Sequence, residues 1–252
     1  MWSVRRNAKS RMTPRIIYED ESLMVIEKPS GVVVNEAQSV KEETIQSWFA
    51  KKCSVLSTQY SVDSEFLQKG GVVHRLDKDT SGVMVLAKTL NAYEMLKSQF
   101  LERKTVKKYT ALVHGGFRDP EGVISQPIIR HPKDRHRFTT EKGGDLSRTA
   151  ITHWKVVKQY SVLSAQYSLL ELEPHTGRTH QLRVHLQYMH HPIVSDPIYG
   201  FKKTWKEDLT WCPRLFLHAK YLEFTHPATD ERVKFESELP SELEQVVASL
   251  VH

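Results

Sequence analysis

A short loop that is dense in charged and hydroxyl side chains, Gly71–Gly82, carries the first residues that could do chemistry. Arg75 lies two residues before Asp77, and Thr80 and Ser81 follow with turn-forming hydroxyls. An apolar run typical of a buried strand comes next, and loops displayed on a rigid scaffold often carry function. The pattern predicts a carboxylate that is held ionised, oriented and accessible. An ordinary surface ion pair at a strand entry would show the same Arg-x-Asp spacing.

A second constellation of polar residues occupies Glu173–His185. Arg178 stands at the mouth of a predicted helix, where free backbone N–H groups and the helix dipole favour anions. Arg183 lies one turn further on and shares a predicted face with His180 and Gln187. Its guanidinium could hold a carboxylate in two-point geometry. A solvated helix face with an incidental arginine is the alternative interpretation.

The thirteen histidines invite a metal-site hypothesis, but their spacing does not support one. His180, His185 and His190 are each five residues apart, so they do not stack on one helical face as ligands at i and i+4 would. The chain has no HExxH, and Cys53 and Cys212 form no CxxC. The sequence therefore predicts no metal site.

A basic segment, Arg130–Arg148, surrounds an aromatic residue, Phe138. Most charge runs are simply solvated faces. A basic hairpin tipped with an aromatic ring can also grip a nucleic-acid backbone and support an unstacked base. We favour nucleic-acid binding, because the excess positive charge is concentrated here and at the N-terminus. Arg135 and Arg137 are the candidate contacts, and Gly143-Gly144 is the predicted turn.

The elements that must position these residues are mainly strands. Thr89 can cap a helix that runs to about Arg103, a helix is predicted over 179–189, and another follows Pro240. Residues 51–70 are polar and weakly patterned, which predicts a loop. Strands are predicted at 16–18, 23–27, 83–88, 107–113, 150–158, 165–172, 215–224 and 231–236. Because helices do not alternate regularly with strands, the predicted class is α+β with a mostly antiparallel sheet.

Composition sets the broad class of the protein. The 252 residues are 39% hydrophobic and 26% charged, as in ordinary globular proteins, and the net charge of +6 favours a polyanionic partner. No apolar run approaches the length of about 20 residues that a membrane helix needs. Two distant cysteines are typical of a reducing compartment, so a cytoplasmic location is expected. The basic first residues predict a flexible tail over 1–12 and leave organelle targeting open.

Taken together, the segments resemble the RluA-type RNA pseudouridine synthase family from residue 16 to about 237. Each motif is weak alone, but their order and spacing together are specific. The matching segments are Ile17–Gly31, His74–Gly82, Lys107–Tyr109, His175–His185, His191–Gly200 and Arg214–Ala219.

The resemblance implies roles for the matched positions. Asp77 would be the essential aspartate, Arg183 would pair with it, and Tyr109 would pack against the target base and take part in the closing proton transfer. Arg75 would help to hold the target uridine out of its stack. Further substrate or RNA contacts would come from His74, Thr80, Arg178 and His180, beside Arg135 and Arg137 of the hairpin. The family needs no metal or organic cofactor.

The resemblance also implies a fold with a central mixed, mainly antiparallel sheet, flanking helices and an active-site cleft. We expect residues 13–252 to form one catalytic domain, with two subdomains around that cleft and no separate N-terminal RNA-binding domain. The expected partner is structured RNA, ribosomal or transfer, and the expected state is a monomer away from membranes.

Two other functions compete with RNA isomerisation. A non-catalytic RNA chaperone could use the same cleft to remodel RNA, and its activity would survive loss of Asp77. A metal-dependent nuclease or phosphohydrolase would need clustered ligands, which the sequence does not offer.

Overall fold

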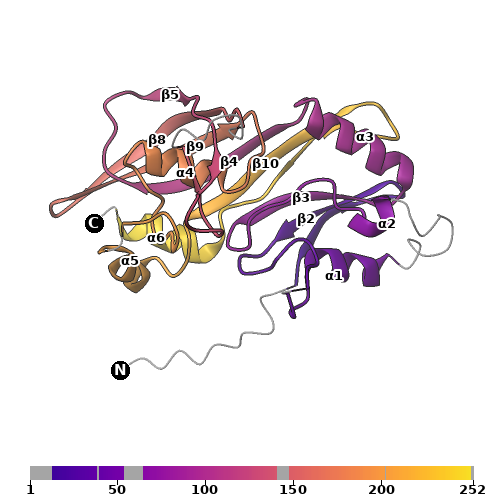
Figure 1. The fold of residues 1–252 in the computed structure, drawn as a ribbon, viewed down its shortest axis with the longest axis horizontal. Coiled ribbons are helices and arrows are strands. Elements are labelled where there is room, and N and C mark those ends of the chain that lie inside the picture. The colour runs from indigo at the N-terminus through magenta and orange to yellow at the C-terminus, as the bar shows by residue number, and fades with distance from the viewer. Residues whose placement is uncertain (1–12, 39, 54–64, 141–147, 202, 251–252) are drawn as a thin grey trace. The chain divides into compact units, whose positions relative to one another are not determined.

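The computed structural model of the chain describes residues 13–38, 40–53, 65–140, 148–201 and 203–250 (Figure 1). The chain divides into two compact units. The first comprises residues 1–105 and 223–235, and the second comprises residues 106–222 and 236–252.

Antiparallel strands form the framework of the first unit. Strand β2 pairs with β1 on one side and with β3 on the other. Strand β3 is buried along its whole length, because its residues are almost all apolar. The turn between β1 and β2 is fixed by Asp20, whose Oδ1 accepts hydrogen bonds from the amides of Ser22 and Leu23. The strands are β1 (Arg15–Glu19), β2 (Leu23–Lys28) and β3 (Ser81–Ala87).

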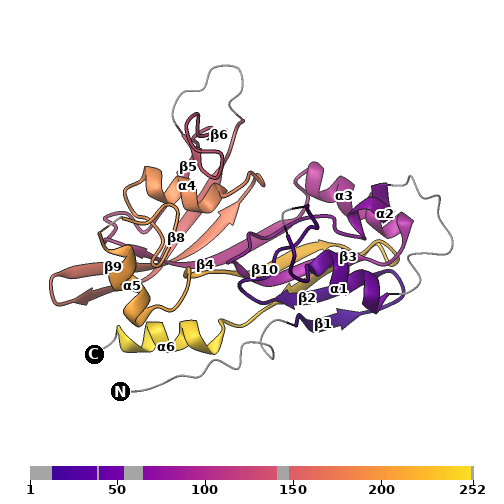
Figure 2. The ribbon, with the colours of Figure 1, turned by 60° about the horizontal axis from the view of Figure 1, so that its bottom comes forward.

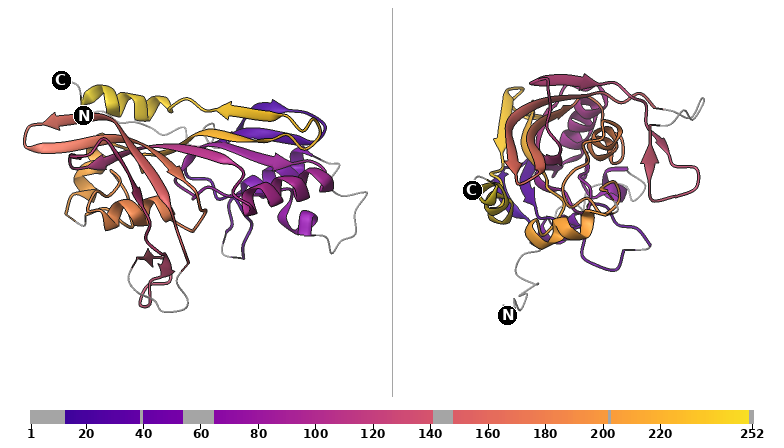
Figure 3. Two further views of the ribbon diagram at one scale, coloured as in Figure 1. Left: turned by 90° about the horizontal axis from the view of Figure 1, so that it is seen from above. Right: turned by 90° about the vertical axis from the view of Figure 1, so that its left-hand side faces the viewer.

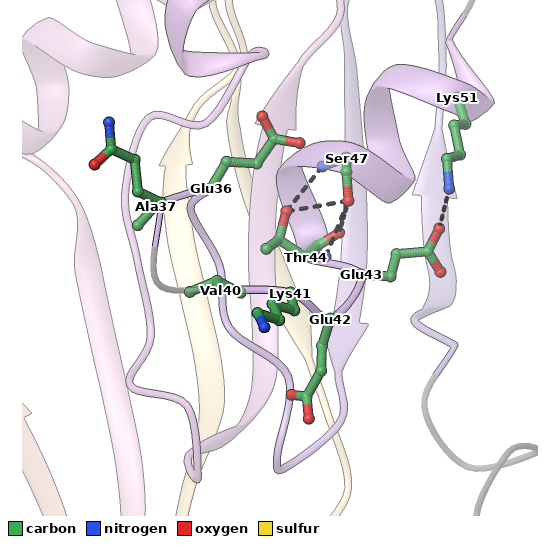
Figure 4. Close-up of a pocket in the computed structure, with 10 residues that line it drawn as sticks. Glu36, Ala37, Val40, Lys41, Glu42, Glu43, Thr44, Ser47 and Lys51 are labelled. Atoms are coloured by element: carbon green, nitrogen blue, oxygen red, sulfur yellow. Dashed lines mark hydrogen bonds and ion pairs between the residues drawn. The ribbon is translucent and has the colours of Figure 1, made fainter.

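The described residues of the first unit form three short helices, and the purple helices α2 and α3 lie on the same face of its strands (Figure 3). They are α1 (Ile45–Lys52), α2 (Glu65–Lys69) and α3 (Leu90–Leu101). Thr44 and Ser47 form a capping box at the start of α1 (Figure 4). Thr89 caps α3 as predicted, since its hydroxyl accepts from the amide of Ala92.

The second unit is built on four antiparallel strands in the order β4-β9-β8-β5. Residues 111–113 of β4 are completely buried, so this strand faces apolar surroundings on both sides. The core around it includes Leu170, Leu182, Leu186 and Phe216. The strands are β4 (Val106–His114), β5 (Glu121–Ile124), β8 (Thr152–Val162) and β9 (Ala165–Pro174).

Helices and a small hairpin complete the second unit. The helices are α4 (Gln181–Tyr188), α5 (Trp205–Trp211) and α6 (Ser241–Ser249). The hairpin consists of β6 (Ile129–Arg130) and β7 (Phe138–Thr139). It projects beyond strands β5 and β8 of its own unit (Figure 2).

Backbone hydrogen bonds give the full strand order β1-β2-β3-β10-β4-β9-β8-β5, with β11 paired to β10. These last strands are β10 (Leu217–Thr225) and β11 (Arg232–Glu236). A central mixed sheet flanked by helices confirms the predicted α+β class. Within the described residues, no helix is long and apolar enough to cross a bilayer.

The structure corrects several sequence-based element predictions. Helix α2 occupies the end of the loop predicted at 51–70, and residues 54–64 of that loop lie outside the described part of the chain. Helix α1 was not predicted because its buried side is only Ile45 and Phe49, too short a pattern to detect. Strand β5 and helix α5 were also missed. The predicted tail at 1–12 and the predicted Gly143-Gly144 turn lie outside the described residues.

Candidate active site

The loop that carries Asp77 is anchored to strand β3 at its start and closed by a turn at its end. At its start, the Gly71 carbonyl accepts from the amide of Ala87 at 2.9 Å. Gly71 has a φ of +73°, and an added Cβ would lie 2.2 Å from the Ala87 carbonyl oxygen, so only glycine fits. At its end, the amide of Thr80 donates to the carbonyl of Asp77, which closes a turn.

A buried lysine, Lys28, supports the same loop through hydrogen bonds to backbone carbonyls. Lys28 has no exposed surface, and its Nζ donates to the carbonyls of Pro29, Val32 and Lys78 at 2.8 to 3.0 Å. The Lys78 carbonyl also accepts from the amide of Gly31. Burying an ammonium is costly unless it is fully hydrogen-bonded, so this carbonyl cage explains how Lys28 is tolerated. It ties the residue that follows Asp77 to the 29–32 turn.

Successive side chains of the loop differ in their exposure to solvent. Arg75 is exposed, Leu76 is buried and Asp77 is half-buried. His74 points inward, since its Nε2 accepts from the amide of Val85 and its ring stacks on Phe100 at 4.4 Å.

Thr80, predicted with His74 as a substrate contact, is buried. Both residues therefore support the loop from inside, and direct RNA contact by either one stays a prediction.

A surface pocket lies beside the start of α1 (Figure 4). Three glutamates and two lysines lie among its lining residues, and one of them, Glu42, is paired with Lys78 of the loop at 3.7 Å. The charged residues of the lining are Glu36, Lys41, Glu42, Glu43 and Lys51. Because carboxylates outnumber ammonium groups, the pocket does not suit a polyanion.

Tyr109 lies on strand β4 of the second unit, opposite Leu172 of β9. It is half-buried and packs against the core cluster of this unit. The prediction that Tyr109 belongs to a strand with Ala111 and Val113 is confirmed. Leu112, between Ala111 and Val113, is completely buried as well, so both faces of the strand are covered here.

Arg183 holds a carboxylate in two-point geometry, as its residue type suggested. Its Nε and Nη2 donate to the two carboxylate oxygens of Asp196 at 2.8 and 2.7 Å. Arg183 is 3% exposed and Asp196 is 1% exposed, so the pair is buried. Asp196 Oδ1 also accepts from the amides of Ile198 and Tyr199, which leaves the carboxylate well satisfied.

The surroundings of Arg183 correct two expectations about helix α4. The helix begins at Gln181 and not at Thr179, because His180 adopts a left-handed backbone with a φ of 56°. His180 therefore does not share a helical face with Arg183. The face that carries Arg183 is also not solvated, since every residue from Gln181 to Leu186 is buried.

Arg178 does not offer a free amide at the helix mouth. Its N–H donates to the side-chain oxygen of Gln181, and its Nε donates to the carbonyl of Thr149 at 3.2 Å. The prediction that this amide is free to bind an anion is wrong, because it already donates to the side chain of Gln181. The role of the Arg178 guanidinium in RNA binding stays a prediction.

The hairpin and the start of α4 meet around one buried side chain, Tyr199. Its hydroxyl is 2.9 Å from both the amide of Phe138 and Nδ1 of His180. The guanidinium carbons of Arg137 and Arg183 lie 5.6 and 5.2 Å from the centre of its ring. Arg137 of the hairpin is thus brought together with His180 and Arg183 at the start of α4.

The tip of the hairpin is exposed and basic. Arg135 is exposed, and its carbonyl accepts from the guanidinium of Arg130. Arg130 also lies over the ring of Phe138, with 5.1 Å from guanidinium carbon to ring centre. Arg137 is half-buried, and its Nε is a buried N–H without a hydrogen-bond acceptor in the described structure. The arrangement offers cations and an aromatic ring on one short projection.

Sequence reasoning missed the residues that hold the predicted ones. Asp196 and Tyr199 lie in a segment used only for the family resemblance, and Lys28 lies in another. The sequence pattern Asp-x-x-Tyr-Gly does not indicate which arginine its aspartate and tyrosine will contact. Only Gly200 could have signalled a tight turn, since an added Cβ would lie 2.5 Å from the Asp196 carbonyl oxygen.

Asp77 belongs to the first unit, and Tyr109 and Arg183 belong to the second. The pairing of Asp77 with Arg183 stays a prediction. Among the described residues, no group of three or more His, Cys, Asp or Glu side chains is placed to hold a metal ion.

Comparisons with known proteins identify the family. Residues 22–188 match the model of the RNA pseudouridylate synthase family. An uncharacterised RNA pseudouridine synthase of Aquifex aeolicus is 41% identical over 238 residues, which cover 93% of this chain and 72% of the relative. Ribosomal large subunit pseudouridine synthase D of Pseudomonas aeruginosa is 37% identical over 236 residues, 90% of this chain and 68% of the relative.

Solved structures agree with the sequence relatives. Human RNA pseudouridylate synthase domain containing 1 superposes with a TM-score of 0.71 at 26% identity, and covers 96% of each chain. The family resemblance drawn from the motifs is confirmed. The chain belongs to the RNA pseudouridylate synthase family, whose members are isomerases that act on RNA.

Proposed function

We propose that this protein converts uridine to pseudouridine in large-subunit ribosomal RNA, with Asp77 as the essential carboxylate. The observation that carries the proposal is the loop at 71–82, which displays Asp77 while backbone anchors fix the chain on both sides of it. Relatives named as ribosomal large subunit synthases support ribosomal over transfer RNA.

The reaction explains why these residue types are needed. The bond from ribose C1′ to N1 of the base breaks, the base turns, and C5 bonds to C1′ before it loses its proton. The target nucleotide must leave the helix first, at a cost of roughly a few kcal/mol. A carboxylate can capture or stabilise the electron-poor sugar, or assist loss of its 2′ proton, and a positioned base must then accept the C5 proton.

Each proposed role fits the local environment of its residue. Asp77 is half-buried and acts at the sugar, while exposed Arg75 helps to hold the flipped nucleotide. Tyr109, half-buried on β4, packs against the base and takes part in the proton transfer that ends the reaction.

The proposed role of Arg183 is to hold the Asp77 carboxylate ionised and aimed. Two hydrogen bonds to Asp196 fix the guanidinium itself. In this proposal the buried Asp196 fixes Arg183, and Arg183 in turn fixes Asp77.

RNA recognition is assigned to the basic hairpin and the neighbouring side chains. Arg135 and Arg137 supply cations to the phosphate backbone, together with Arg178, and Phe138 supplies a stacking surface. His180, half-buried His74 and buried Thr80 shape the substrate contacts. The single catalytic domain around one cleft, the monomeric state and the cytoplasmic location remain predictions.

Pseudouridine mapping in the source organism tests the proposal. Cells without this gene should lose pseudouridine at one or a few positions of large-subunit ribosomal RNA, and a restored wild-type gene should return it. A gene that encodes Asp77→Asn should not. An unchanged pseudouridine map in the deleted cells would contradict the proposed substrate. Full restoration by the Asp77→Asn gene would favour a non-catalytic RNA chaperone.

A further inference from the structure

Tyr199 occupies a position that its sequence context did not reveal. It is 1% exposed and forms a small core cluster with Ile128, Ala150 and Val184. Phe138 of the hairpin packs against this cluster. A tyrosine this deeply buried needs partners for its hydroxyl, so its hydrogen bonds define what it does.

The hydroxyl joins two elements that are 42 residues apart in the chain. The amide of Phe138 donates to the Tyr199 oxygen at 2.9 Å, and Nδ1 of His180 lies 2.9 Å away on the other side. Since the oxygen already accepts from Phe138, the phenol proton is best used as a donor to Nδ1 of His180. Burial raises the pKa of Tyr199 to about 12, so the phenol keeps its proton at physiological pH.

The ring of Tyr199 contacts both arginines through its faces. Arg137 comes from the hairpin and Arg183 from helix α4, with guanidinium carbons 5.6 and 5.2 Å from the ring centre. Cations at this distance are attracted by the ring quadrupole, and the attraction grows when water is excluded. The amide of Tyr199 donates to Asp196, the carboxylate that holds Arg183. One residue therefore contacts Arg183 directly and also through its carboxylate partner.

We infer that Tyr199 is a positioning residue of the isomerisation, an inference that rests on the proposed function. Tyr199 holds the RNA-binding hairpin against the start of α4 and so keeps Arg183 and His180 aligned. The left-handed backbone of His180 costs conformational free energy, and the hydrogen bond to Tyr199 helps to stabilise this conformation. RNA held by the hairpin is thereby held in register with Arg183.

The Tyr199→Phe variant isolates the hydroxyl. It keeps the ring against both arginines and keeps the amide bond to Asp196, but it removes the links to Phe138 and His180. We expect the Phe138 amide to exchange hydrogen for deuterium about tenfold faster, as loss of one hydrogen bond allows. The single-turnover rate at saturating RNA should also fall about tenfold, while the affinity for RNA changes less than about threefold, because phosphate contacts dominate binding.

A matched control and a second variant separate positioning from general stability. Tyr160→Phe removes the hydroxyl of another buried tyrosine, in the other core cluster of this unit, and should leave exchange at Phe138 and the turnover rate unchanged. Tyr199→Leu removes the ring as well, and should slow turnover further than Tyr199→Phe.

Two results would overturn the inference. One is unchanged exchange at Phe138 in Tyr199→Phe, because the hydroxyl would then not secure the hairpin. The other is faster exchange with a wild-type turnover rate, because the link would then be structural only. Failure of the proposed function is seen separately, as wild-type protein that forms no pseudouridine, and the exchange measurement still reports on the link in that case.

Discussion

The loop around Asp77 and the start of helix α4 hold their charged groups by different means. The loop is held through its backbone: carbonyls of Gly71, Asp77 and Lys78 accept hydrogen bonds, and the ammonium of Lys28 is buried beneath it. Arg183 is held by side chains, namely the carboxylate of Asp196 and the ring of Tyr199. The loop should therefore tolerate side-chain changes on its outer surface, whereas α4 should tolerate few changes at its start.

The largest stability effect is expected at Asp196. The Asp196→Ala variant leaves the Arg183 guanidinium buried without this partner, and breaking a buried ion pair in this way costs about 3–5 kcal/mol. Urea unfolding should show the loss as a lower midpoint. Asp119→Ala, an exposed aspartate of the same unit, should cost less than about 0.5 kcal/mol. Equal effects of the two changes would contradict the side-chain anchoring of Arg183.

The next effect is expected at Lys28, whose side chain anchors the loop. Lys28→Met leaves three carbonyls without their ammonium donor and should cost about 2–3 kcal/mol. Lys51→Met is the control, because the Lys51 side chain is 73% exposed and its ion pair contributes little. Urea unfolding measures both variants. A loss at Lys28 no larger than that at Lys51 would show that the carbonyl cage does not stabilise the loop.

Two glycines test whether backbone geometry holds the loop. Both have positive φ, +73° for Gly71 and +88° for Gly31, so alanine is strained at either position by about 1 kcal/mol. Only at Gly71 would the new Cβ also collide with a carbonyl, whereas nothing lies within 4 Å at Gly31. Thermal unfolding should therefore show a larger loss for Gly71→Ala than for Gly31→Ala. The reverse order would be inconsistent with the observed anchoring of Gly71 on Ala87.

The smallest effect is a pH dependence within α4. Burial lowers the pKa of His185, whose ring is hydrogen-bonded to Thr152 and to the Gln126 carbonyl. The unfolded chain therefore binds the proton more readily, so this contribution to stability is present above about pH 6.5 and is lost as the pH falls below it. His185→Gln should flatten the dependence of the unfolding free energy between pH 7 and 5. An identical pH profile for the variant would mean that His185 does not contribute.

The same contrast explains how much could be predicted from the sequence. The loop was predictable because its signals are local: glycine, hydroxyls and an apolar strand follow one another within 17 residues. Most strands and α3 were found for the same reason, through short periodic patterns and the Thr89 cap. The carboxylate that Arg183 holds in its own unit could not be found, because Asp196 lies 13 residues away across a turn.

Helix α4 shows where local reasoning fails. A left-handed residue, His180, delays the start of the helix. Histidine adopts that conformation more often than most residues other than glycine do, but still too rarely to be predicted from one position. The burial of Arg183 was also hidden, because a charged residue at a polar position of a helix is usually solvated. Asp196 and Tyr199 offset the cost of burying this charge, and the sequence alone does not show that they contact Arg183.

The most direct test of the proposed chemistry compares two aspartates of one loop. Purified wild-type protein, Asp77→Asn and Asp79→Asn are each incubated with a large-subunit ribosomal RNA transcript, and pseudouridine is mapped over time. Wild type and Asp79→Asn should form pseudouridine at the same position and at similar rates. Asp77→Asn should fall below roughly a thousandth of the wild-type rate, as loss of an essential group does. Pseudouridine formation by Asp77→Asn at a near wild-type rate would contradict the central role of this carboxylate.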